Sequence, residues 1–309
     1  MPFKSGFVAI VGRANAGKST LVNTLVGQKV SIVSPKPQTT RNRIQGILNR
    51  DDVQIVLIDT PGIHKPETAL NRMMMDELEN TLDGLDILSL IVDASADFGH
   101  GDKFALEWIH RFAGPVFLLL NKIDRIPKPH LLPLIDRYRK LYEFAEVYPI
   151  SALTGAGCFD LVSGWISRLP EGEPYFPPGQ FTDQPERFLA SEIIREKAIL
   201  ATREEIPHAI CVLVDSFEEG KSLLRIRATL FVERDNQKGI LIGKAGSVLK
   251  KIGTQARIEL ESILGTKVFL ETFVKVQPNW RQNPAMIRQL DWHRQLEQLA
   301  DLQDSPETV

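Results

Sequence analysis

The chain has little cysteine, no histidine pattern and no long apolar run, and each shortage excludes a class of protein. Only Cys158 and Cys211 are cysteines among 309 residues, too few for a disulfide framework, which fits a reducing compartment. The six histidines lack the spacing of a ligand set, so we expect no zinc site. No apolar stretch approaches the roughly 20 residues that span a bilayer, and no signal-peptide pattern precedes the first strand. We therefore expect a cytoplasmic protein.

A large excess of one charge is also lacking. The chain carries 37 Lys and Arg residues against 39 Asp and Glu residues, a net charge of −2, so any nucleic-acid footprint must be local. The length predicts two domains, and a segment dense in proline and glycine (169–179) is typical of an interdomain linker. We predict a first domain over 1–170, a linker over 171–184, a second domain over 185–280 and a tail over 281–309.

What is present begins with a phosphate-binding motif. Residues Gly12 to Ser19 match G-x-x-x-x-G-K-[ST] and directly follow the apolar run Phe7 to Val11. A buried strand that enters such a glycine-rich turn directs backbone N–H groups at a phosphate, beside the N-terminus of the next helix. Lys18 can span the β- and γ-phosphates, and Ser19 can ligate Mg²⁺. The predicted contact residues are Gly12, Arg13, Ala14, Asn15, Ala16, Gly17, Lys18, Ser19 and Thr20.

A second motif follows the apolar run 53–58. It reads Asp59-Thr60-Pro61-Gly62. An aspartate at this strand end can hold Mg²⁺ through water, and the N–H of Gly62 can meet the γ-phosphate. By itself the pattern is weak, since chance turns share it, but its place after a strand agrees with the first motif.

Two more motifs predict which base the nucleotide carries. Asn121-Lys122-Ile123-Asp124 follows the apolar run 116–120, and Ser151-Ala152 follows the predicted strand 147–150. The Asp124 carboxylate can accept two hydrogen bonds from the ring N–H and amine of guanine. Adenine lacks these donors and would leave a desolvated charge unpaired, at about 1–3 kcal/mol or more.

The remaining groups of these two motifs complete the base site. Asn121 would contact the far edge of the purine, the stem of Lys122 would cover the ring, and Ser151-Ala152 would donate a backbone N–H to the guanine carbonyl. All four motifs follow predicted strands, and ligands of open α/β sheets bind outside the carboxyl ends of the strands. The sequence therefore predicts an α/β domain with a mostly parallel sheet and a GTP or GDP site.

The second half of the chain predicts the order α-β-β-α-α-β. The helix spans 185–203, with Pro207 marking its end, and the strands span 208–215, 223–233 and 267–277. Residues 224, 226, 228, 230 and 232 are apolar and share one face. Between the last two strands, Gly243 and Gly246 form a G-x-x-G pattern with Lys244 at its tip, where a nucleic-acid backbone can approach.

This pattern predicts a smaller α+β domain of the type II KH class, which binds single-stranded RNA. Basic residues concentrate around the loop, so its charge agrees with that reading. Trp280, Arg281, Trp292 and Arg294 follow in the tail; they either pack on the domain or stack on bases, and we expect packing. The predicted RNA contacts are Ile240, Ile242, Gly243, Lys244, Ala245, Gly246, Val248, Lys250 and Lys251.

With these motifs the sequence resembles the translation-factor-related GTPases, and more closely the Era family. The likeness covers nearly the whole chain and rests on 12–19, 38–41, 59–62, 121–124, 151–152 and the G-x-x-G loop. It implies a P-loop GTPase domain followed by a KH domain. It also implies GTP hydrolysis to GDP, binding to the 3′ region of 16S ribosomal RNA, and a role in rRNA processing and assembly of the 30S subunit. We expect a monomer that associates in part with the inner face of the cell membrane.

The resemblance also assigns catalytic roles, to Lys18, Thr40, Asn15 and Gly62. Thr40 corresponds to the threonine that closes on Mg²⁺ and the γ-phosphate. Asn15 corresponds to an asparagine that helps to hold a catalytic K⁺; alternatively, it only braces the loop. The family commonly carries proline and valine where this chain has Ala14 and Ala16, for which we expect a change in loop stiffness and retained binding.

The residue that orients the attacking water in Ras-like enzymes is missing from this sequence. Ile63 stands where Ras-like enzymes carry the glutamine that orients this water, so intrinsic turnover should be slow. Arg13 and Arg41 could supply charge, although we expect both to face solvent. Two other classes of function stay open: an RNA scaffold in which GTP is structural, and a membrane- or cell-cycle-associated GTPase whose KH domain binds a protein.

Overall fold

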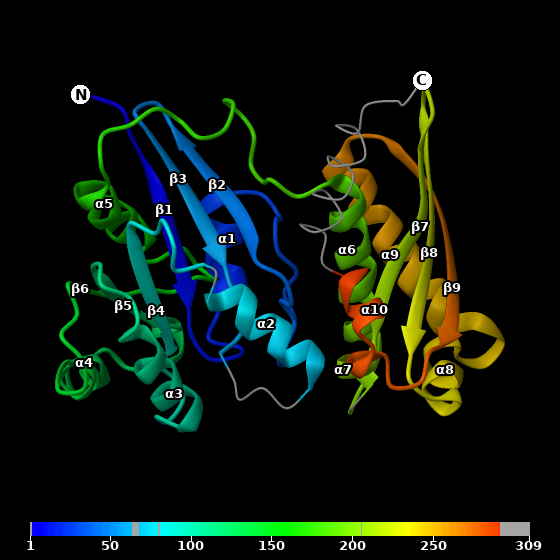
Figure 1. The fold of residues 1–309 in the computed structure, drawn as a ribbon, viewed down its shortest axis with the longest axis horizontal. Helices are drawn as coiled ribbons and strands as arrows, with labels where there is room; N and C mark the ends of the chain where they lie inside the picture. Colours follow the sequence, from blue (N-terminus) through cyan, green and yellow to red (C-terminus); the bar gives the residue numbers. More distant parts are fainter. Residues whose placement is uncertain (1, 64–67, 80, 205, 291–309) are drawn as a thin grey trace, which may run out of the picture. The chain divides into compact units, whose positions relative to one another are not determined.

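The computed structural model describes residues 2–63, 68–79, 81–204 and 206–290 (Figure 1). The chain divides into two compact units. The first comprises Met1–Lys65 and Met74–Gln184, and the second comprises Pro66–Met73 and Pro185–Val309. No helix within the described ranges is long and apolar enough to cross a membrane.

The first unit is built on a six-stranded sheet in the order β2-β3-β1-β4-β5-β6. The ladders are parallel except the one between β2 and β3. The strands are β1 Lys4–Val11, β2 Ile44–Arg50, β3 Val53–Asp59, β4 Ile87–Asp93, β5 Val116–Asn121 and β6 Glu146–Pro149. The helices up to Gln184 are α1 Lys18–Val26, α2 Ala69–Glu79, α3 His100–Ile109, η1 Ile123–Arg125, η2 Lys128–His130, α4 Leu131–Arg139 and α5 Cys158–Arg168.

Helices cover both faces of this sheet, and this explains the apolar runs of its strands. Every residue of β3 and β5 is buried, as expected for parallel strands packed on two sides. One core joins the sheet to α1 and α5, and the other joins it to α3 and α4. Trp165 of α5 is fully buried and donates its indole N–H to the Ser89 hydroxyl at 3.1 Å.

The predicted linker packs along the β2–β3 edge of the sheet. The Ile47 N–H donates to the Phe181 carbonyl at 2.9 Å. Gln54 exchanges two hydrogen bonds with the backbone of Phe176, each 2.9 Å long. At its end, the Gln184 amide donates to the Val30 carbonyl at 2.8 Å. The segment therefore protects an exposed sheet edge and belongs to the first unit up to Gln184.

The second unit holds a three-stranded sheet in the order β7-β8-β9, antiparallel between β7 and β8 and parallel between β8 and β9. Its elements are α6 Glu186–Ala201, α7 Ile206–Ala209, β7 Cys211–Glu219, β8 Leu223–Val232, α8 Asp235–Ile242, η3 Lys244–Gly246, α9 Ser247–Leu264, β9 Lys267–Val276, η4 Trp280–Gln282 and α10 Pro284–Arg288. The predicted fold class of both parts, with the order α-β-β-α-α-β in the second, is confirmed.

Alternation along β8 is as predicted on its inner side. Leu224, Ile226, Ala228, Leu230 and Val232 are all at most 4% exposed and share a core with α6 and α9. The first strand was predicted too early: residues 206–209 form α7, which contains Pro207, and β7 begins at Cys211. Proline is tolerated in the first turn of a helix, where its missing N–H costs nothing.

The start of the predicted tail packs as expected. Trp280 is fully buried and donates its indole N–H to the Ala209 carbonyl at 2.8 Å. Arg281 pairs with Glu233 at 2.6 Å. Trp292 and Arg294 lie outside the described residues.

Candidate functional site

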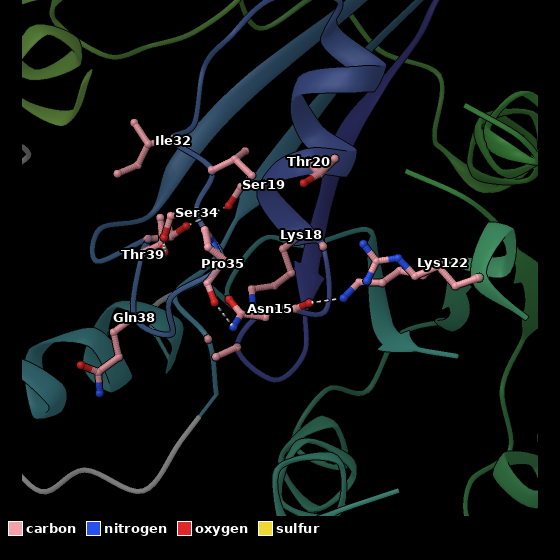
Figure 2. Close-up of a pocket in the computed structure, with 16 residues that line it drawn as sticks. Asn15, Lys18, Ser19, Thr20, Ile32, Ser34, Pro35, Gln38, Thr39 and Lys122 are labelled. Atoms are coloured by element: carbon pink, nitrogen blue, oxygen red, sulfur yellow. Dashed lines mark hydrogen bonds between the residues drawn. The ribbon is translucent and has the colours of Figure 1, made fainter. Parts of the chain in front are cut away.

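The phosphate-binding turn joins β1 to α1 and needs glycine at its end. Gly17 has φ 105°, a backbone conformation that L side chains rarely adopt, and a Cβ built there would lie 2.2 Å from Asn121 Nδ2. Lys18 is the first residue of α1. Figure 2 shows Lys18, Ser19 and Thr20 at the start of this helix, facing the segment that carries Ser34, Pro35 and Thr39.

Lys18 is buried and directed back at the turn. It is 5% exposed, and its ammonium donates to the carbonyls of Gly12 and Arg13, both at 3.1 Å. Burial lowers the pKa of Lys18 to about 8, while the charge of Asp59 opposes that shift. A phosphate would be a stronger partner than two neutral carbonyls for this cation, so the geometry suits capture of a polyphosphate.

Three predicted magnesium ligands meet beside Lys18. The Ser19 and Thr40 hydroxyls are 2.9 Å apart, and Thr40 Oγ1 donates to Asp59 Oδ2 at 3.4 Å. Asp59 is fully buried, and its Oδ1 has no hydrogen-bond partner. Burial raises the pKa of this carboxyl, opposed by neighbouring hydroxyls and by the Lys18 charge. A buried orphan oxygen among oxygen donors fits Mg²⁺, which prefers such ligands.

Ser31 also belongs to this cluster, although it was not predicted. Its hydroxyl donates to Asp59 Oδ2 at 2.6 Å. Asn23 of α1 positions it, because its side-chain oxygen accepts the backbone N–H groups of Val30 and Ser31, each at 2.9 Å. No motif marks Ser31; only the fold brings it to the end of β3.

The segment around Thr40 closes on the phosphate-binding turn. The Asn15 amide donates to the Pro35 carbonyl at 2.8 Å, and the Asn15 carbonyl accepts from the Lys122 ammonium at 2.8 Å (Figure 2). Between the turn and this segment lies a cavity of about 430 Å³, within the range of small-molecule sites. Its lining includes Gly17, Lys18, Thr40, Gly62 and Lys122.

At the base end, Asn121 holds two loops together. It ends β5 and is 2% exposed. Its amide donates to the Ala16 carbonyl at 2.8 Å, and its side-chain oxygen accepts the Ala152 N–H at 2.8 Å. The structure thus gives Asn121 a bracing role within the protein, and its expected contact to the purine edge stays a prediction.

The two backbone donors expected to meet guanine already have acceptors. The Ala152 N–H donates to Asn121, and the Ser151 N–H donates to the Ala156 carbonyl at 2.9 Å. The expected contact of the Ala152 N–H with a guanine carbonyl stays a prediction. The sequence showed which loop lies here, but it could not show that these N–H groups pair within the protein.

Lys122 and Asp124 follow Asn121, at the end of β5 where the base is expected to bind. Asp124 is exposed in η1, directly after β5. Lys122 has φ 65° and forms an ion pair with Asp93 at 2.5 Å. Hydrogen bonds from Lys122 and Ser95 lower the pKa of Asp93, although burial opposes this. Asp93 was not predicted, although it ends the apolar run 87–92 and so carries the same strand-end signal as Asp59.

Two expectations about charged side chains were wrong. Arg41 is buried at 5% exposure and does not face solvent. Arg13 is partly buried and pairs with the buried Asp102 at 3.3 Å, so it braces α3 against the turn.

Ile63 is 2% exposed and packs in the core, and its N–H donates to the Gly12 carbonyl at 3.1 Å. It cannot orient water.

The remaining residues of the second motif differ in role. Thr60 is fully buried and donates its hydroxyl to the Ile10 carbonyl at 2.8 Å, which ties β3 to β1. Pro61 follows it. Gly62 lies so close to the turn that a Cβ built on it would be 3.0 Å from Ala14 Cα.

The G-x-x-G loop of the second unit is an exposed turn between α8 and α9. Gly243 has φ 73°, and a Cβ there would lie 2.4 Å from Val248 Cγ2. Gly246 borders open space, so a nucleic-acid backbone can approach it. Lys244, Ala245, Lys250 and Lys251 are exposed, as is Ile240 at 52%. Ile242 and Val248 are half-buried beside the loop.

Known proteins match both units. Residues 7–122 match the family described as 50S ribosome-binding GTPase, and residues 205–281 match the KH domain. GTPase Era of Syntrophus aciditrophicus (strain SB) is 50% identical over 293 residues, covering 94% of this chain and 96% of the relative.

Two crystal structures agree with the fold. Era in complex with MgGDPNP and nucleotides 1506–1542 of 16S ribosomal RNA is 44% identical, with a TM-score of 0.89, and the match covers 93% of this chain and 98% of that one. A single-residue variant of Aquifex aeolicus Era bound to GDP·AlF4⁻ gives the same identity and TM-score, over 93% and 99% of the two chains.

The order of motifs, the buried pocket, the KH loop and these similarities agree over nearly the whole chain. The chain therefore belongs to the Era family of GTPases.

Proposed function

We propose that this GTPase is a nucleotide-controlled RNA-binding protein that binds the 3′ region of 16S ribosomal RNA and acts in rRNA processing and assembly of the 30S subunit. The observation that carries the proposal is the presence, in one chain, of a nucleotide pocket lined by the buried Lys18 and Thr40 and of an exposed G-x-x-G loop. The crystal structure of the related Era with that RNA supports it.

The pocket offers each part of a GTP·Mg²⁺ complex a complementary group. Ser19, Thr40 and Asp59 would hold Mg²⁺, and the buried orphan Oδ1 of Asp59 is the oxygen best suited to it. Bound there, the ion neutralises charge on the β- and γ-phosphates. Lys18 adds a second positive charge. The N–H groups of the glycine-rich turn orient the β-phosphate at the start of α1.

Hydrolysis then depends on position and charge more than on covalent chemistry. Thr40 and the Gly62 N–H would close on the γ-phosphate from two sides, which fixes the direction of attack. Ile63 is buried in the core and cannot orient the attacking water, so we expect a slow intrinsic rate.

Asn15 is the residue that we propose binds a K⁺ ion to activate GTP hydrolysis. Its amide contacts the Pro35 carbonyl at 2.8 Å, so an oxygen-rich position can form there once the amide turns its oxygen inward. K⁺ would be held by Asn15 and would supply the charge that an arginine finger supplies elsewhere.

Initial GTP hydrolysis rates in KCl and NaCl at equal ionic strength test this assignment. We expect a rate about tenfold or more higher in K⁺, and Asn15→Ala should lose that preference while it keeps the slow rate in Na⁺. Equal rates for the unaltered protein in both salts would contradict a role for K⁺ in hydrolysis.

RNA affinity tests the central proposal. We expect a single-stranded RNA from the 3′ region of 16S rRNA to bind more tightly in the presence of a non-hydrolysable GTP analogue than in GDP, at matched salt, and a scrambled RNA to bind weakly in both. Coupling of this kind requires different interaction energies in the two nucleotide states. If sequence and nucleotide made no difference, both the target and the switch would be wrong.

The family resemblance also motivates a cytoplasmic monomer with peripheral association at the inner face of the cell membrane. Flotation with anionic vesicles measures that association directly. Recovery of the protein with vesicles at physiological salt is expected; complete retention in the soluble fraction would restrict the protein to the cytoplasm.

A further inference from the structure

The KH sheet has one face covered by helices and one face with exposed aromatic rings. On β9, Val268, Leu270 and Val274 pack in the core with α6 and α9. Phe269 and Phe273 alternate with these residues and are 45% and 46% exposed. Because side chains alternate across a strand, the two rings stand on the face opposite the helices. We call this face, on β8 and β9, the outer face.

Positive charge lies beside the two rings. The Arg225 guanidinium is 5.5 Å from the centre of the Phe269 ring, and Arg225 is the β8 partner of Phe269 in the ladder. Arg227 pairs with Glu271 at 3.5 Å. Lys275, exposed on the same face, follows Phe273 by two residues. Two further acids, Asp215 and Glu218, lie on β7, which is separated from β9 by β8.

We propose that the outer face is a second contact surface for single-stranded RNA, in which bases stack on Phe269 and Phe273 while Arg225, Arg227 and Lys275 neutralise phosphates. The inference rests on the RNA-binding function proposed above. Exposed aromatic rings interleaved with cations are the arrangement by which proteins hold single strands without reading their sequence. Arg225 already lies over one ring, and a base would add a further flat partner.

The spacing of the rings favours nucleic acid over an apolar protein partner. The rings are four positions apart along the strand, about 13 Å at the rise of a β-strand, and Glu271 stands between them on the same face. A protein-docking patch needs contiguous apolar surface, which a carboxylate between the rings interrupts. Separate bases on a flexible strand do not need it.

The position of the rings also connects them to the first RNA site. β9 is the edge strand of its sheet, and the helices on either side of the G-x-x-G loop, α8 and α9, contact it. A KH groove holds about four nucleotides. A longer strand that leaves the groove across the β9 edge reaches the outer face directly.

Two RNA lengths separate this surface from the groove. Fluorescence anisotropy of the full-length protein would use 5-nucleotide and 15-nucleotide RNAs from the 3′ region of 16S rRNA. With Phe269→Ala and Phe273→Ala combined, we expect the affinity for the longer RNA to fall about tenfold or more, within the range of base–aromatic stacking, and the affinity for the shorter RNA to change less than about twofold.

Matched variants exclude trivial causes. Phe269→Tyr with Phe273→Tyr keeps both rings and should retain affinity for the longer RNA. Ile258→Ala removes an exposed apolar side chain, 56% exposed on α9, and should change neither affinity. Arg225→Gln with Arg227→Gln should lower the slope of log affinity against log salt by up to about 1.4 for the longer RNA only.

The outcomes are distinguishable. Unchanged affinity of the double alanine variant for the longer RNA overturns the inference and leaves the face to a protein partner, while short-RNA binding shows that the KH groove still works. If the unaltered protein binds neither RNA, the proposed function fails, and this inference fails with it.

Discussion

The nucleotide pocket and the KH loop bind their ligands by opposite physical means. At the nucleotide site, Asp59, Asn121 and Lys18 are at most 5% exposed; Asp59 and Asn121 are hydrogen-bonded to other loops, and Lys18 is hydrogen-bonded to its own turn. In the KH unit, Lys244, Lys250 and Lys251 are exposed. Buried polar groups discriminate strongly, because a wrong ligand leaves them unpaired. Exposed cations act additively and are screened by salt. Substitutions in the pocket should therefore cost far more than substitutions on the loop.

The largest effect is expected at Lys18. Lys18→Ala removes the buried cation that faces the phosphates, and we expect kcat for GTP hydrolysis to fall about 10²–10³-fold, the usual cost of removing one group that stabilises transition-state charge. Phosphate-release kinetics measure this. RNA binding without nucleotide should be unaffected, since the KH loop lies in the other unit. Turnover near the original rate would show that the pocket is not the hydrolytic site.

Asp124 comes next. Asp124→Asn replaces one accepting oxygen with an NH2 donor, so one of the two guanine donors loses its partner and GTP affinity should fall about 10- to 100-fold, equivalent to the 1–3 kcal/mol of an unsatisfied polar group. Affinity for xanthosine triphosphate should rise. Titration calorimetry with both nucleotides measures the exchange, with Asp136→Asn, an exposed aspartate on α4, as the matched control. Unaltered GTP binding would place base recognition elsewhere.

Asp183, a half-buried residue whose Oδ1 atom is buried, tests whether partial burial of a charge is also costly away from the pocket. Its Oδ1 has no hydrogen-bond partner, and burial raises its pKa to about 6, partly opposed by Arg43. A raised carboxyl pKa contributes stability below pH 3.8, and that contribution is lost as pH rises through about 6. At pH 7.5, Asp183→Asn should raise the free energy of unfolding by about 1–2 kcal/mol.

At about pH 3, below the unfolded-state pKa of 3.8, this difference should vanish, because the Asp183 carboxyl is then neutral in both the folded and the unfolded chain. Urea unfolding at the two pH values measures it, and an equal effect at both would contradict the titration. Asp136→Asn again serves as the control, since an exposed carboxyl should show no such dependence.

The smallest effect is expected on the KH loop. Lys244→Ala should weaken RNA binding by only a few-fold and lower the slope of log affinity against log salt by about 0.7, the value for one phosphate contact on a single strand. Lys221→Ala, in the exposed β7–β8 turn, should leave the slope unchanged. A loss as large as that expected for Asp124→Asn would erase the contrast between the two regions.

Most of the fold could be predicted from periodicity. Runs of apolar residues predicted β1, β3 and β5, and the alternation of apolar and polar residues along β8 predicted its inner face correctly. The start of β7 was misplaced because Pro207, taken as the end of a helix, lies within the short helix α7. The docking of residues 171–184 on the β2–β3 edge was not predictable, because its hydrogen bonds join segments more than 100 residues apart.

Local patterns were enough to identify the nucleotide motifs and the G-x-x-G loop. A phosphate turn and a left-handed glycine are local requirements of the backbone, so they appear as short patterns. The pairing of the polar groups depends instead on the folded chain: Ser31 with Asp59, Asp93 with Lys122, Arg13 with Asp102, and Asn121 with two loops at once. The position of Phe269 and Phe273 on the sheet face opposite α6 and α9 depends on it too. Such pairings depend on which strand ends become neighbours in the folded chain, and no local spacing encodes that.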